Sequence, residues 1–166
     1  MNRLFWGLFF VLLDYKVKIG TAVVEILPDF VGFYLLMRGM ESLGEKSSRF
    51  DRGRHMAFAM TIVSGLLFGA DLLNPDTHTK VWLWIAGVAA LAAGLGIVRC
   101  TVLGLEDMGK GTENLKGMWL ILTVLHMLCG VVSWVPLVGD VCGIVSVATG
   151  ALFLAIWVRE NKKSAE

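Results

Sequence analysis

Four long apolar runs constrain this chain more than any other feature of its sequence. They cover about residues 56–73, 81–103, 118–135 and 141–158. Each approaches the ~20 mostly apolar residues that a helix needs to cross a bilayer. The chain is 17% charged, whereas soluble domains hold about 25% charged residues. We therefore predict an all-α fold, a polytopic helical membrane bundle with four clear transmembrane helices.

Two shorter apolar segments precede these runs, at about residues 4–15 and 28–43. A helix over 28–43 would be about 24 Å long, less than the ~30 Å of the hydrocarbon core. We expect the two segments to form a short N-terminal helical hairpin that packs against the four spans. The prediction is six membrane segments in a single integral membrane domain, residues 1–166.

The basic residues are distributed unevenly between the two ends of these segments. Only Lys16, Lys18 and Lys80 of the 15 Lys and Arg residues fall in the loops of one side. The other twelve fall at the termini or in the loops of the opposite side. Since Lys-rich and Arg-rich loops stay in the cytoplasm, we expect a multi-pass protein of the cell membrane with cytoplasmic N- and C-termini.

The segment between the two short helices is rich in β-branched residues and contains Gly20. At its end Leu27 precedes Pro28, and a residue before proline is biased away from the helical conformation. We therefore predict an extended or irregular connector over residues 16–27. Proline suits the first turn of a helix, so the next helix should begin at Pro28.

A second interpretation of this stretch stays open at the level of the sequence. One long helix from about residue 20 to 43, kinked at Pro28, would place Glu25 and Asp29 one turn apart on the same face. The two carboxylates would then lie deep in the membrane, where ionisable groups are costly and commonly functional. With the extended connector, Asp29 instead places a negative charge at the positive end of a helix.

The run "ILPDFVGFYLLMRGMESL", after "LFWGLFFVLLD", resembles a group of small multi-pass membrane proteins of Gram-positive bacteria. These proteins share an L-P-D-F-x-G motif near the N-terminus. The motif is matched by Pro28, Asp29, Phe30 and Gly32, while Phe33 stands where a tyrosine is expected. The resemblance covers about residues 4–50; it implies a bacterial membrane protein and no particular activity.

Five polar residues within or beside the membrane segments are candidates for function. Asp14 is four residues from Lys18, so the two would pair on one face of a helix. Glu25 and Asp29 suit cation binding or proton relay, or else helix-start electrostatics.

His126 is the most central ionisable side chain of the long runs and suits a proton relay, or else a neutral ring bonded to a neighbouring helix. Arg38 is expected to snorkel to the cytoplasmic surface, as is Arg99.

Small residues recur every four positions on several predicted helices and indicate close helix packing. They are Gly65 and Gly69 in the third segment, Ala86, Ala90 and Gly94 in the fourth, and Ser146 and Gly150 in the sixth. This pattern fits packing within one bundle or a homo-oligomer interface. The three cysteines, Cys100, Cys129 and Cys142, form no C-x-x-C pair and are interpreted as packing residues.

No catalytic motif and no metal-ligand spacing occurs in the sequence, so we expect no cofactor and no metal. The net charge of +1 gives no basis for a nucleic-acid partner. The leading hypothesis is a non-enzymatic helper, sensor or assembly component whose partners are the lipid bilayer and its own copies or another membrane protein. The alternative is a small oligomeric transporter or channel-like protein with a polar path through Glu25, Asp29 and His126. An enzyme acting on lipid is the least favoured.

Overall fold

The computed structural model describes residues 2–13, 16–19, 22–25, 28–73, 80–110, 112–132 and 136–163. These residues form six α-helices, one 3-10 turn and two short strands. In chain order the elements are α1 (Asn2–Leu12), β1 (Lys16–Ile19), β2 (Ala22–Glu25), α2 (Asp29–Glu41), η1 (Gly44–Lys46), α3 (Ser48–Leu73), α4 (Lys80–Asp107), α5 (Glu113–Val132) and α6 (Pro136–Lys163).

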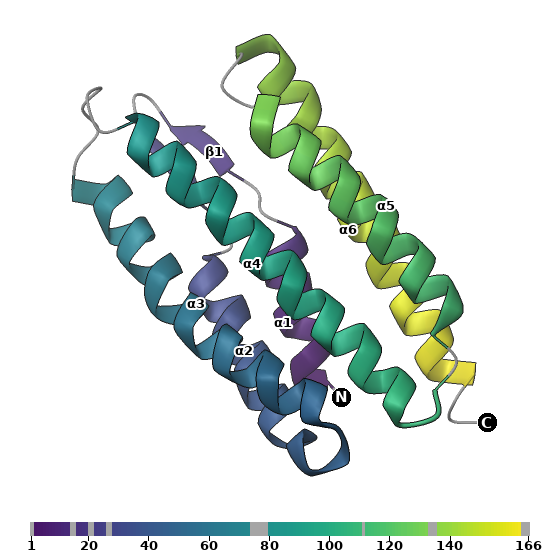
Figure 1. Cartoon of the computed structure of the whole chain (residues 1–166). Helices are drawn as coiled ribbons and strands as arrows, with labels where there is room; N and C mark the ends of the chain where they lie inside the picture. Colours follow the sequence, from purple (N-terminus) through teal and green to yellow (C-terminus); the bar gives the residue numbers. More distant parts are fainter. Residues whose placement is uncertain are drawn as a thin grey trace.

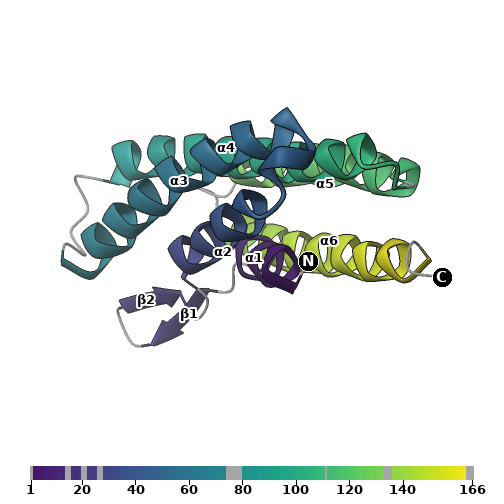
Figure 2. The ribbon, with the colours of Figure 1, turned by 90° about the horizontal axis from the view of Figure 1, so that it is seen from below.

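The helices form two layers (Figures 1 and 2). Helices α3, α4 and α5 make one layer, and α2, α1 and α6 make the other. Each long helix packs on the next one in sequence, while α1 joins α2 to α6 and α2 contacts α3, so the six helices close into a ring. Both termini lie at the same end of this ring (Figure 1).

Glycines bring the two short helices α1 and α2 close together. A Cβ atom added at Gly7 would lie 2.7 Å from the Leu36 side chain, and one added at Gly39 would lie 2.7 Å from Leu4. Side chains as bulky as Leu4 and Leu36 are fully buried at this contact. The pair therefore forms the centre of the apolar core, as the predicted N-terminal hairpin requires.

Three helices are long and apolar enough to cross a membrane: Trp84–Asp107, Glu113–Val132 and Val141–Asn161. Helix α3, which we expected as a fourth span, is not among them in the described part of the chain. Its first two turns hold Arg49, Asp51, Arg52 and Arg54, and these charges shorten its apolar stretch. A fourth span therefore stays a prediction.

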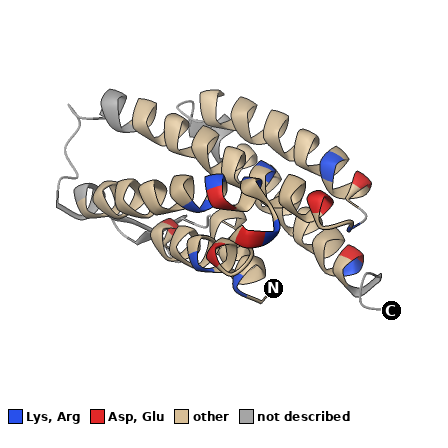
Figure 3. Cartoon of the chain, turned by 60° about the horizontal axis from the view of Figure 1, so that its bottom comes forward, with Lys and Arg blue, Asp and Glu red and all other residues tan. Residues whose placement is uncertain are grey.

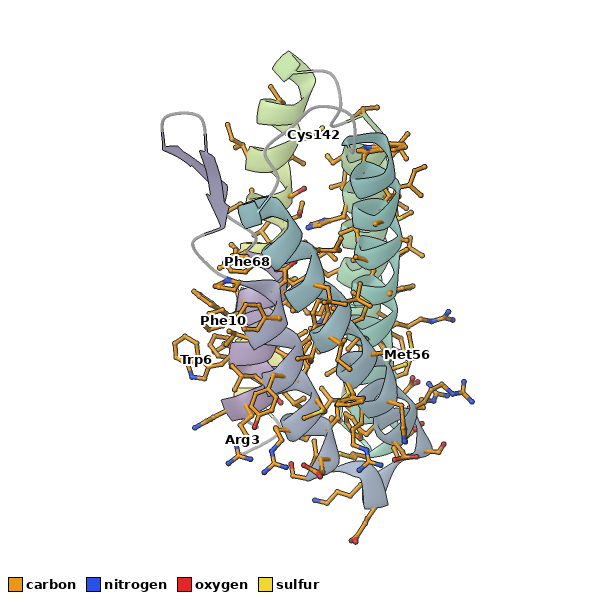
Figure 4. All side chains as sticks on the ribbon, turned by 90° about the vertical axis from the view of Figure 1, so that its left-hand side faces the viewer. Arg3, Trp6, Phe10, Met56, Phe68 and Cys142 are labelled. Atoms are coloured by element: carbon orange, nitrogen blue, oxygen red, sulfur yellow. The ribbon has the colours of Figure 1, made fainter. Side chains whose placement is uncertain are left out.

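The described residues of the connector between α1 and α2, 16–19 and 22–25, are extended. Strands β1 and β2 pair antiparallel, with Lys16 opposite Glu25 and Ile19 opposite Ala22. The hairpin projects from the α1–α2 pair on the side away from the two termini (Figure 4). The alternative of one kinked helix from residue 20 to 43 is wrong, because residues 22–25 are a strand and α2 begins at Asp29.

Among the described residues coloured in Figure 3, most Lys, Arg, Asp and Glu positions lie toward the end of the bundle where both termini lie. There Asp107, at the end of α4, accepts a hydrogen bond of 2.5 Å from the Ser47 hydroxyl and pairs at 3.3 Å with Arg49. Asn114 of α5 donates to Glu160 of α6 at 3.0 Å. These contacts join the start of α3 to the end of α4, and the start of α5 to the end of α6, at the same end of the bundle.

Candidate functional site

The carboxylate candidates from the sequence fall near the start of α2. Asp14 lies outside the described residues. Glu25 ends β2, where its backbone pairs with Lys16. Asp29 is the first residue of α2, directly after the N-cap residue Pro28, and its side chain is half-buried. This position places the Asp29 carboxylate at the positive end of the helix dipole, as the extended-connector interpretation expects.

His126 lies in the second half of α5 and is buried. Its Nδ1 atom is 2.9 Å from the carbonyl oxygen of Leu122, one turn earlier in the same helix. The expectation that its ring bonds to a neighbouring helix is therefore wrong for the described residues. One turn away, the Thr123 hydroxyl is buried and takes no hydrogen-bond partner in the described chain.

The structure does not bring Asp29 and His126 together. Helix α2 packs on α1 and α3, whereas α5 packs on α4 and α6. The two helices are thus not neighbours in the ring. A polar path through both residues, as the transporter hypothesis requires, has no support from the described contacts.

The two arginine candidates differ from expectation in the partners that they find. Arg38 pairs with Glu41 at 2.6 Å at the exposed end of α2. Arg99 does not extend alone toward the surface; its guanidinium lies over the ring of Trp119, 5.3 Å from the centroid. Trp119 also donates from Nε1 to the Leu95 carbonyl at 3.1 Å. The Trp119 indole of α5 therefore contacts two residues of α4, Leu95 and Arg99, which lie one turn apart.

Arg52 of α3 lies near Arg99, because a Cβ at Gly53, the neighbour of Arg52, would lie 3.1 Å from the Cβ of Cys100, the neighbour of Arg99. Arg49, one turn earlier on α3, is neutralised by Asp107. Among the described residues, Arg52 and Arg99 make no ion pair with a carboxylate. Sequence reasoning missed this convergence, because the residues come from different helices and only Arg99 was singled out in the sequence.

The predicted packing glycines differ in what lies against them. A Cβ at Gly150 would lie 2.5 Å from the Leu12 carbonyl oxygen, and one at Gly94 would lie 3.3 Å from Phe33. At Gly65 the nearest atom is the Phe30 Cβ at 4.0 Å, and at Gly69 nothing lies within 4 Å. Among the described residues, the G-x-x-x-G face of α3 is therefore uncovered at Gly69, while Phe30 of α2 lies against Gly65.

The remaining candidate groups have ordinary structural surroundings. Ala86, Ala90 and Ser146 are partly buried. All three cysteines are free thiols. Within the part of the chain that the structure describes, no three His, Cys, Asp or Glu residues converge as metal ligands.

No protein-family model, curated protein or solved structure matches this chain.

Proposed function

We propose that this chain is a multi-pass integral membrane protein of the bacterial cell membrane that works by contact with other membrane helices and not by catalysis. Three helices that are long and apolar enough to cross a membrane support the membrane location. The resemblance of residues 4–50 to small membrane proteins of Gram-positive bacteria supports a bacterial origin. The excess of basic residues at the end with both termini supports a cytoplasmic orientation of that end.

The open glycine face of α3 carries the functional part of this proposal. In lipid, helices associate through close backbone approach at small residues, because the hydrophobic effect does not drive them together. Gly7, Gly39 and Gly150 are each covered by atoms of this chain, whereas no described atom lies within 4 Å of a Cβ at Gly69. Phe58 and Ile62, on the same face of α3, are 55% and 51% exposed. Among the described residues, the Gly69 end of this face is thus apolar and uncovered, and a second copy of this chain is the partner to test first.

Cysteine cross-linking in native membranes tests the proposal. A cysteine-free background carrying Ile62→Cys should give a disulfide-linked dimer, and Gly69→Leu in that background should reduce its yield severalfold. Gly143→Leu on α6 is the matched control, since a side chain there also enters open space. If Gly69→Leu leaves the yield unchanged, or if Gly143→Leu lowers it equally, self-association through this face is excluded.

A further inference from the structure

We propose that α3, α4 and α5 form a binding site for one anionic phospholipid in the leaflet at the charged end of the bundle. The phosphate would lie between Arg52 and Arg99, and an acyl chain would lie along the small-residue face of α4. This inference requires a membrane location but no self-association, so it can hold or fail apart from the proposed dimer contact.

The headgroup part of the site consists of the guanidinium groups of Arg52 and Arg99, whose positions on α3 and α4 lie beside each other. Gly53, the neighbour of Arg52, packs against Cys100, the neighbour of Arg99; a Cβ at Gly53 would lie 3.1 Å from the Cys100 Cβ. Both arginines are exposed. Their net positive charge is not cancelled by any described carboxylate, whereas Asp107 already neutralises Arg49.

The Trp119 ring prepares Arg99 for an anion. A guanidinium stacked on an indole face keeps its N–H edges free, and these edges match phosphate oxygens in a bidentate geometry. Trp119 is itself fixed by its hydrogen bond to Leu95. The arginine is therefore held in place before a lipid arrives, which lowers the entropy lost on binding.

The acyl-chain part of the site is the outer face of α4 above Arg99. Ala89, Ala92 and Gly96 lie on the same helix face as Arg99, at spacings of three and four residues. Both alanines are exposed. Met56 of α3 borders this face, since its Cε would lie 3.3 Å from a Cβ at Gly96, and Figure 4 shows Met56 beside α4.

The charge and the shape of this site together indicate which ligand it binds. The face on α4 is lined by small side chains between bulkier ones of α3 and α5, and it ends at two unneutralised cations. A diacyl lipid with a phosphate and a net negative charge matches both features. Juxtamembrane Arg and Lys attract anionic lipids with an energy that falls off within a Debye length.

Native mass spectrometry of the purified full chain in detergent tests the site, with phosphatidylglycerol and phosphatidylcholine as the two probes. The wild type should retain one phosphatidylglycerol in preference to phosphatidylcholine. Arg52→Gln, which breaks no described contact, should weaken phosphatidylglycerol binding about fivefold, and adding Arg99→Gln should weaken it more than tenfold. Arg159→Gln removes an exposed charge elsewhere on the bundle and should change nothing.

Ala92→Leu provides a second test, because it obstructs the acyl chain and keeps every charge. It should weaken binding of phosphatidylglycerol even if the double arginine variant fails to fold. Equal loss in Arg159→Gln would show diffuse charge attraction and overturn the site. Unchanged binding in Arg52→Gln and Ala92→Leu would overturn it as well. Competition by inorganic phosphate as strong as by phosphatidylglycerol would show a phosphate site and not a lipid site.

Discussion

Gly150 is the residue at which the bundle tolerates least extra volume. Its Cα faces the last turn of α1, where an added Cβ would meet the Leu12 carbonyl oxygen at 2.5 Å. A backbone atom cannot rotate away as a side chain can, so Gly150→Ala must separate α1 from α6. We expect a loss of about 1–3 kcal/mol in stability, the usual cost of overpacking. Thermal unfolding in detergent, followed by circular dichroism, measures it.

Gly143→Ala is the control for this prediction, because the same helix carries it and nothing lies within 4 Å of its added Cβ. Alanine is the better helix former by up to about 1 kcal/mol, so this variant should be as stable as the wild type or more so. Equal behaviour of the two alanine variants would contradict the close approach of α1 and α6.

A second residue-scale prediction concerns Lys110, in the loop after α4. Burial lowers the pKa of the Lys110 ammonium group below its usual value, and the nearby positive charge of Lys46 lowers it further. The unfolded chain therefore binds more protons than the folded chain between the lowered pKa and the ordinary value of about 10.4. In that window stability should rise with pH.

Lys46→Gln removes the neighbouring charge and should flatten this rise. At neutral pH the variant should gain about 0.5 kcal/mol or less, a size typical of exposed charges. The gain should vanish at a pH where the Lys110 amine is neutral, and also in high salt, which screens exposed charges. Unfolding midpoints over a pH series at two salt concentrations measure both effects. A gain that persists at high pH or in high salt would exclude charge repulsion as its cause.

At the scale of elements, the β1–β2 hairpin distinguishes the two interpretations of the segment before α2, which were an extended connector over residues 16–27 and one kinked helix over residues 20–43. Val17 lies directly opposite Val24 in the antiparallel register. In a background without native cysteines, Val17→Cys with Val24→Cys should form an intramolecular disulfide under mild oxidation, since directly opposed Cβ atoms are about 4.5–5.5 Å apart. A mobility shift on non-reducing gels and mass spectrometry measure it.

Val17→Cys with Val23→Cys is the matched control for this pair. Residue 23 is opposite Lys18 in the register and not opposite residue 17. Because successive side chains of a strand alternate between its two faces, this control should cross-link far less. Equal cross-linking by both pairs would show a mobile connector, and cross-linking by neither would exclude this strand register.

The order and type of the elements could largely be predicted from the sequence. Apolar runs predict helices in lipid because every backbone polar group must be satisfied internally. The bias of Leu27 against helix indicated that α2 starts near Pro28, one residue from the observed start at Asp29. The antiparallel pairing was not predicted, since β-branched composition indicates extension but names no partner strand.

The contacts between elements could not be predicted in the same way. Gly65 and Gly69 form the G-x-x-x-G motif of the sequence, yet no described atom lies within 4 Å of a Cβ at Gly69, while Gly150 is tightly covered. A small-residue pattern shows that a face is flat and says nothing about which helix lies on it. Likewise, Arg99 and Trp119 are 20 residues apart across a loop, so their stacking depends on the register of α4 against α5.

At the scale of the whole molecule, the cytoplasmic orientation that we propose depends on where the termini and the basic residues lie. Both termini, η1 and the α4–α5 loop lie at the same end of the bundle (Figure 1), and most of the described Lys, Arg, Asp and Glu positions lie toward that end (Figure 3). Translocating that end would carry an excess of Lys and Arg across the membrane, which the positive-inside rule disfavours. The half-length helices α1 and α2 would then enter the bilayer from the cytoplasm and turn back at the hairpin.

Reporter fusions in a bacterial host test this orientation. Green fluorescent protein at the C-terminus should fluoresce, and alkaline phosphatase at the same point should be inactive, because the two reporters work only inside and only outside respectively. The phosphatase inserted between α3 and α4 should be active and serves as the control for expression and folding. An active phosphatase at the C-terminus would show that the bundle has the opposite orientation, with Arg52 and Arg99 in the outer leaflet. The lipid site would then face a different lipid composition, so orientation decides which anionic lipid can occupy it.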